Sequence, residues 1–182
     1  QPEDPDDEPD LEGAKAELDD LYERRFERMN DFEKQTVLNF YTNYWLTLEN
    51  YPEAISTFEQ LLAIEELRED TRLRTLRSLG QLTAAEERWR DSIRYYELWR
   101  EASLEEDDVV YRGLSYAHYQ VDELPEALPY WISYMELLLT NGEELGRDDY
   151  SYLNGLYFQL EDFESALPLT KTMIVLFDEQ TD

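Results

Sequence analysis

Residue types that commonly carry catalysis or bind metals are scarce in this chain. His118 is the only histidine, and cysteine is absent. No thiolate nucleophile, thiolate zinc site or cluster of histidines can therefore form. His118 lies close in the sequence to Tyr111, Leu114 and Tyr119, so we expect a packed, partly buried histidine.

Two pairs of adjacent acids resemble catalytic carboxylates. Asp107 with Asp108 and Asp148 with Asp149 both precede apolar helical patterns, where acids favour the positive end of a helix and accept hydrogen bonds from its first amides. Phosphate-binding glycine motifs and the calcium-loop spacing are missing. We predict no enzyme, no cofactor and no metal site; an enzyme would need a titratable cluster in a closed pocket.

The charge of the chain limits its partners. The 182 residues carry a formal charge of −28. Residues 1–20 hold ten acids and one lysine, or −9 of that excess. Such a field repels nucleic acid and anionic lipid surfaces, so we expect neither as a partner.

The amino-terminal residues give little sign of a fold. Residues 1–10 contain three prolines and six acids, a composition that predicts a disordered acidic tail. The chain starts at Gln1, which fits a cleaved export signal and a trimmed chain equally well. No apolar run is long enough to cross a bilayer, so we expect no membrane insertion.

A spaced trio of side chains recurs along the chain. Each trio has a small residue, a residue that is aromatic in most copies and an apolar residue at i, i+4 and i+7, which places them on one helix face. The copies are Ala54, Phe58, Leu61; Ser92, Tyr96, Trp99; Ala127, Trp131, Tyr134; and Ala166, Thr170, Met173. Their first residues are 38, 35 and 39 positions apart (54 to 92, 92 to 127, 127 to 166). This period predicts an all-α solenoid of helical hairpins.

The trio register divides the chain. Residues 11–34 form a partial repeat, with a helix over 11–29 and a further trio at Ala14, Leu18 and Leu21. Residues 35–182 form an array of about four hairpins. Gly80 is predicted to lie where two antiparallel helices approach closely. Pro129 and Pro168 each follow the small residue of a trio by two positions, which supports the register.

The trio resembles the second helix of the tetratricopeptide repeat (TPR). The Leu-Gly pair of that repeat matches Leu79-Gly80, and its aromatic three places on matches Trp45 and Tyr157, although Thr83 and His118 depart from it. The aromatic before the second helix matches Tyr51, Trp89 and Phe163, and the closing proline of the repeat is absent. The resemblance covers about Gln35 to Asp178. It implies a right-handed solenoid that binds proteins, and it does not identify the partner.

A narrower resemblance involves four runs: DFEKQTVLNF, LENYPEAISTFEQLLAI, VDELPEALPYW and FQLEDFESALPLTKTMIVLFDE. They look like the repeat proteins that accompany TonB, ExbB and ExbD energy-transduction systems. That resemblance implies a periplasmic accessory that binds a component of the machinery. A generic cell-envelope assembly factor and a cytoplasmic chaperone-like adaptor remain alternatives.

The TPR resemblance also implies a binding surface, because first helices line the concave face in that family. Transferred to this register, the groove carries Asn39, Asn43, Arg74, Arg77, Gln81, Arg112, Tyr116, Tyr119, Ser151 and Phe158. Guanidinium groups pair with carboxylates in a bidentate fashion. We therefore expect the groove to select an extended segment, or a partner helix, that carries an acidic group. In the alternative, the arginines pair with neighbouring acids such as Glu69, Asp70 or Asp108.

The last predicted helix ends in an apolar run. Met173 to Phe177 reads MIVLF, and no single neighbouring helix can cover five consecutive apolar side chains. Repeat arrays normally finish with a polar capping helix. Either the natural protein continues beyond Asp182, or a second copy covers this surface in a homodimer.

Overall fold

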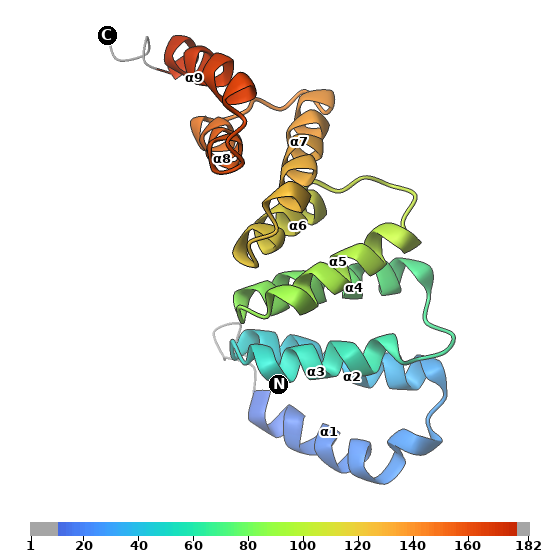
Figure 1. Cartoon of the computed structure of the whole chain (residues 1–182). Helices are drawn as coiled ribbons and strands as arrows, with labels where there is room; N and C mark the ends of the chain where they lie inside the picture. The colour runs from blue at the N-terminus through green and yellow to red at the C-terminus, as the bar shows by residue number, and fades with distance from the viewer. Residues whose placement is uncertain (1–10, 178–182) are drawn as a thin grey trace, which may run out of the picture. The chain divides into compact units, whose positions relative to one another are not determined.

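The computed structural model describes residues 11–177, and within that range all regular structure is helical (Figure 1). The elements are α1 (Leu11–Arg25), the 3₁₀ helix η1 (Phe26–Arg28), α2 (Asp31–Thr47), α3 (Tyr51–Leu62), α4 (Glu69–Ala85), α5 (Trp89–Ala102), α6 (Asp108–Gln120), α7 (Leu124–Thr140), α8 (Arg147–Gln159) and α9 (Phe163–Phe177). The predicted acidic tail, residues 1–10, lies outside the described range, as do the side chains of Ala14 and Leu21.

The chain divides into two compact units, residues 1–75 and 76–182. In the first unit α2 packs against α1 and α3, and in the second α6 packs against α5 and α7, while α8 packs against α7 and α9. The prediction of a tail, a partial repeat and an array stays a prediction. Helix α1 ends before the predicted Met29, because the chain tightens into η1 ahead of the next helix.

The hairpin turns repeat with the same period as the trios. Glu49, Glu87, Asp122 and Glu161 are the four non-glycine residues with positive φ in the described range, at 54° to 62°. They are separated by 38, 35 and 39 residues (49 to 87, 87 to 122, 122 to 161). The residue after each donates its N–H to a carbonyl five places back, as in Arg88 to Thr83 at 2.8 Å. This is the bond of a Schellman helix stop, so the predicted period is a physical repeat of turns.

The trios pack as predicted. Ala54, Ser92, Ala127 and Ala166 are each completely buried, which lets the helices of each hairpin approach closely. The aromatic residues that follow the first three are buried too. Only the last trio differs, since Thr170 and Met173 are half-buried. Helices α7 and α9 run through their internal prolines without a break.

The acid pairs serve the helix starts, as expected. Asp107 is the N-cap of α6, and its carboxylate accepts the N–H of Val110 at 3.1 Å. Asp149, in the first turn of α8, accepts the N–H of Gly146 at 2.8 Å. Each carboxylate satisfies an amide that the helix itself leaves unpaired.

Candidate partner-binding groove

A hollow of about 330 Å³ lies on the second unit, which we call the groove hollow. Side chains and backbone from α4 to α8 line it: Gln81, Ala84, Tyr96, Val109, Arg112, Gly113, Tyr116, Trp131 and Tyr152. Most of this lining is apolar or aromatic. The hollow therefore suits an apolar side chain, with polar groups at a few points.

The Tyr96 ring forms one wall of the groove hollow. Its side chain is 2% exposed and lies between Gly80 of α4 and Gly113 of α6. A Cβ added at Gly80 would lie 2.5 Å from Tyr96 Cε1, and one at Gly113 would also clash with the ring. The predicted close approach at Gly80 is confirmed. The absence of a side chain at both glycines leaves space for the Tyr96 ring, and close packing fixes its position.

Trp131 and Tyr152 form a second aromatic wall. Their ring centroids are 4.1 Å apart. The Trp131 indole donates to the Asp149 carbonyl at 3.0 Å, and the Tyr152 hydroxyl donates to the Ser115 carbonyl at 3.4 Å. Burial raises the pKa of both Tyr96 and Tyr152 to about 12. These phenols are neutral at physiological pH and are held before any ligand arrives.

Helix α6 turns one face to the groove hollow. Val109, Arg112, Gly113 and Tyr116 follow the spacing i, i+3, i+4, i+7 and all line it, as helical geometry requires of neighbours on one face. Tyr116 is 45% exposed, and its ring meets Trp89 edge to face at 5.7 Å between centroids. Tyr116 therefore offers an exposed, supported contact surface.

Arg112 is the exposed cation of this surface. Its guanidinium carbon lies 6.0 Å from the Tyr134 ring centroid. Among the described residues, no carboxylate approaches it within ion-pair distance. Its charge can therefore be neutralised by a ligand.

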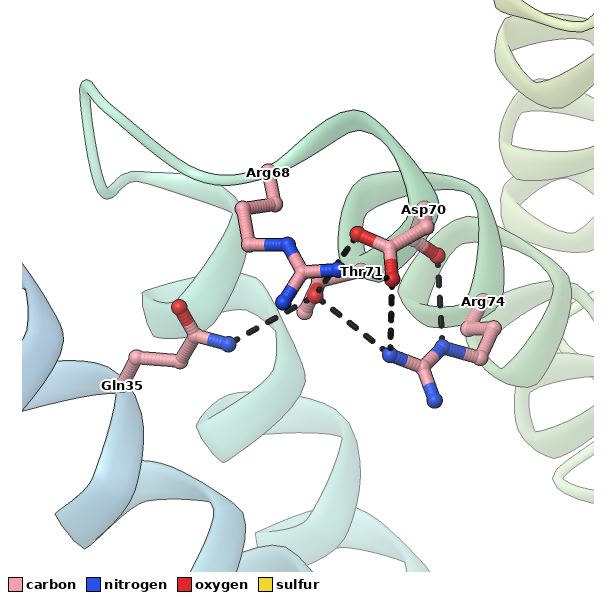
Figure 2. A network of polar contacts seen from close by, with 5 residues as sticks. All are labelled: Gln35, Arg68, Asp70, Thr71 and Arg74. Carbon is pink, nitrogen blue, oxygen red and sulfur yellow. Dashed lines mark hydrogen bonds and ion pairs between the residues drawn. The ribbon is translucent and has the colours of Figure 1, made fainter.

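The other two predicted groove arginines have acidic partners. Arg77 Nε lies 3.1 Å and 3.2 Å from the two carboxylate oxygens of Asp107. Arg74 contacts Asp70 at 3.5 Å. Figure 2 shows Arg68 on the same Asp70 carboxylate at 2.9 Å, with Thr71 beside them. The alternative of pairing with neighbouring acids thus holds for two of the three arginines.

The remaining predicted groove residues are spread over both units. Gln81 and Tyr116 line the groove hollow with Arg112. Asn39 and Asn43 are exposed on α2 of the first unit, as Arg74 is on α4. Elsewhere in the second unit, the Tyr119 hydroxyl accepts from Gln159, the Ser151 hydroxyl donates to the Arg147 carbonyl, and Phe158 packs edge to face on Phe163. Of the ten predicted groove residues, the seven other than Gln81, Arg112 and Tyr116 do not line the groove hollow.

Three aromatic residues of the groove hollow were not predicted as site residues. The sequence pattern predicts only packing between hairpins for Tyr96 and Trp131, yet both also line the hollow. On α8 the register selected Ser151, whereas the adjacent Tyr152 lines the hollow. The sequence signal that could have identified them is the face of α6 with the spacing i, i+3, i+4, i+7. Aromatic residues on the helices that pack beside this face are candidates for the same site.

His118 is packed as expected. It is buried, its ring stacks on Tyr130 with centroids 5.6 Å apart, and its Nδ1 lies 2.8 Å from a Glu123 carboxylate oxygen. Arg90 contacts the same carboxylate at 2.6 Å and is the main cause of its lowered pKa. In the part of the chain described here, no group of three or more acids or histidines is arranged to hold a metal.

Structural comparisons identify the fold. YrrB, described as a TPR protein with an unusual peptide-binding site, matches with a TM-score of 0.67 and 20% identity over 93% of this chain and 79% of YrrB. MamA from Desulfovibrio magneticus RS-1 matches with a TM-score of 0.62 and 14% identity, over 94% of this chain and 88% of that one. BtubC from P. vanneervenii gives 0.60 and 16%, over 96% and 76%.

The fold is TPR-like. The predicted fold class, an all-α solenoid of antiparallel helical hairpins, is confirmed. Searches of protein-family models and of curated proteins found no match. Between residues 11 and 177, no helix has the length and apolar character of a membrane span.

Proposed function

We propose that this chain is a non-catalytic protein-binding scaffold. Its groove hollow takes an extended segment that carries an apolar side chain next to a carboxylate. One observation carries the proposal: Arg112 has no acidic partner among the described residues, although the chain has 44 acids and 16 lysines and arginines. An exposed arginine without a carboxylate partner, beside an apolar hollow, offers a position for a ligand carboxylate.

Charge supports an acidic ligand. Arg112 lies on the same face of α6 as Val109 and Tyr116, so a segment that fills the hollow passes its guanidinium. A carboxylate there would form a charge-assisted hydrogen bond. The overall negative charge disfavours any other acidic segment, so this local attraction adds specificity.

The walls support an apolar anchor. Tyr96, Trp131 and Tyr152 are already held by packing and hydrogen bonds, so little side-chain entropy is lost when a ligand binds. Tyr116 adds a rigid and partly exposed ring. The peptide-binding site of YrrB, a protein of similar fold, supports a peptide as the class of ligand.

Selection from a displayed library of short peptides tests this proposal. The wild-type chain should enrich sequences with a large apolar residue within two positions of Asp or Glu. Arg112→Gln should lose the acidic preference. Arg94→Gln is the matched control, because Arg94 is an exposed α5 arginine outside the groove hollow. Enrichment without acids, or an equal effect of both variants, would contradict the proposal.

A narrower role is a periplasmic accessory to TonB-dependent transport, with TonB, ExbB or ExbD supplying the segment. The four sequence runs that resemble such accessory proteins support it. The test is chemical crosslinking in intact cells followed by purification of the chain. Recovery of TonB, ExbB or ExbD with wild type, reduced in Arg112→Gln, would support this role. Recovery of cytoplasmic chaperones instead would favour the cytoplasmic adaptor.

A further inference from the structure

A second hollow, of about 650 Å³, lies in the first unit where α1 gives way to α2; we call it the corner hollow. Its lining comes from one short stretch: Arg25, Arg28, Met29, Phe32, Glu33, Thr36 and Val37. None of these residues belongs to the predicted groove. Nothing in the proposed function uses them.

The shape of the corner is held by local hydrogen bonds. Asn30 and Glu33 form a reciprocal capping box, with contacts of 2.9 Å and 3.0 Å, and the Thr36 hydroxyl donates to the Phe32 carbonyl at 2.8 Å. These contacts start α2 at Asp31 and place Phe32 in its first turn. The Phe32 side chain is nevertheless 78% exposed. A large apolar ring beside a hollow is therefore open to a ligand.

The two arginines at this hollow are exposed, and no carboxylate of the described residues lies within ion-pair distance of them. Arg24, their neighbour, contacts Asp20 at 2.7 Å. The charged residues of the lining are two arginines and Glu33, a net charge of +1 in a chain of −28. The corner hollow is therefore an apolar surface with a local excess of positive charge.

A complementary surface occurs on the last helix. Ile174, Val175 and Leu176 of α9 are 53%, 60% and 43% exposed. In the sequence they are followed by Asp178, Glu179 and Asp182, and residues 173–182 contain no base. One stretch is thus apolar and then acidic, whereas the corner hollow is apolar and edged with arginines.

We propose that the corner hollow binds residues 173–182 of a second copy of this chain. Ile174 and Val175 enter the hollow against Phe32, and the acids that follow pair with Arg25 and Arg28. The segment at residues 1–10 shares the acidity but has no large apolar side chain, so it fits the hollow less well. The hollow and the segment are different surfaces, so two copies can pair once, which leaves one hollow and one segment free, or reciprocally in a closed dimer.

Light scattering coupled to gel filtration tests the proposal over a concentration series reaching about 1 mM, since small interfaces are weak. The wild-type mass should rise with concentration, to that of a dimer if two copies pair reciprocally and beyond it if they pair only once. A head variant (Arg25→Glu, Arg28→Glu) and a tail variant (Ile174→Ser, Val175→Ser) should each associate at least about tenfold more weakly. All four changes are at exposed positions, and circular dichroism verifies that each variant folds.

Mixing the two variants separates this arrangement from others. The head variant keeps a working tail and the tail variant a working head. An equimolar mixture should therefore form a one-to-one dimer and nothing larger. The control Arg24→Glu with Arg68→Glu alters the net charge equally outside the corner hollow, and it should associate nearly as wild type does.

Two results would overturn the proposal: a wild type that stays monomeric at every concentration, or a mixture that fails to dimerise. Weakening by Arg112→Gln without weakening by the head variant would assign the tail to the groove hollow instead. The proposed function does not depend on any of these results.

Discussion

The groove hollow and the corner hollow both place exposed arginine beside apolar side chains, but they are built differently. Five helices contribute to the groove hollow, and its walls are fixed by tertiary packing such as Tyr96 between Gly80 and Gly113. The corner hollow comes from residues 25–37, fixed by a capping box and a helix turn. The first site should therefore be sensitive to changes in packing, and the second to changes in local sequence.

The largest expected effect is on the packing of the groove hollow. Gly113→Ala places a methyl group against the Tyr96 ring, and because that ring is enclosed the change should cost about 1–3 kcal/mol of stability. Gly155→Ala is the matched control, since an added Cβ there meets nothing within 4 Å. It should stabilise α8 by up to about 1 kcal/mol.

Thermal and urea unfolding measure both alanine variants. Self-association through the corner hollow should survive Gly113→Ala at temperatures where the variant is folded. Equal destabilisation by the two changes would show that Tyr96 is not held between the glycines.

A second comparison is between two arginines. Arg112→Gln should weaken binding of a selected acidic peptide by roughly tenfold, equivalent to about 1.4 kcal/mol. Arg77→Gln should change peptide affinity much less and instead lower the melting temperature, because it leaves Asp107 without its partner at 3.1 Å. Isothermal titration and thermal melts separate the two effects. A loss of affinity from Arg77→Gln equal to that from Arg112→Gln would place both arginines in the site.

The buried phenols predict a response to alkali. Burial raises the pKa of Tyr96, Tyr130 and Tyr152 to about 12, against about 10 in an unfolded chain. The stability gained by keeping these phenols neutral is fully present below about pH 10 and is lost as the pH rises towards 12.

Melting temperatures between pH 8 and 12 test that response. Tyr96→Phe should flatten the decline, whereas Tyr116→Phe, at an exposed ring of the same hollow, should not. No tyrosine lines the corner hollow, so the melting temperature of the head variant should fall with pH as that of wild type does. A decline that is unchanged in Tyr96→Phe would contradict the burial of that hydroxyl.

The smallest expected effect is at the hairpin turns, outside both hollows. Glu87 has a φ of 56°, a conformation that favours glycine, and its charge lies at the negative end of a helix dipole. Glu87→Gly should therefore stabilise the chain by roughly 0.5–1 kcal/mol. Chemical unfolding measures the gain, with Glu86→Gly, a neighbour outside the positive-φ set, expected to destabilise. A loss from Glu87→Gly would mean that the side chain makes a compensating contact.

The repeat could be predicted from the sequence because its signal is local. Small residues that recur at Ala54, Ser92, Ala127 and Ala166 need only helix geometry to define a buried face. Arg112 and Tyr116, four residues apart on α6, share one helix face for the same reason. Gln81 lies on α4 and lines the same hollow through the packing of the two helices.

The rest depended on tertiary contacts. Asp107 neutralises Arg77 from 30 residues away, and no spacing rule predicts that pairing. Tyr152 lines the groove hollow with its ring 4.1 Å from that of Trp131 between centroids, whereas the predicted Ser151 is exposed beside it. That Arg112 has no carboxylate partner among the described residues is likewise a property of the packed helices.

The most direct test of the central claim is a charge exchange across the groove hollow. A selected peptide is measured against wild type and Arg112→Glu by titration, first with its acid and then with that acid replaced by arginine. We predict that each protein prefers the peptide of opposite charge, so that the preference reverses. If the replaced peptide binds Arg112→Glu no better than wild type, Arg112 does not meet the ligand carboxylate and the proposed site is wrong.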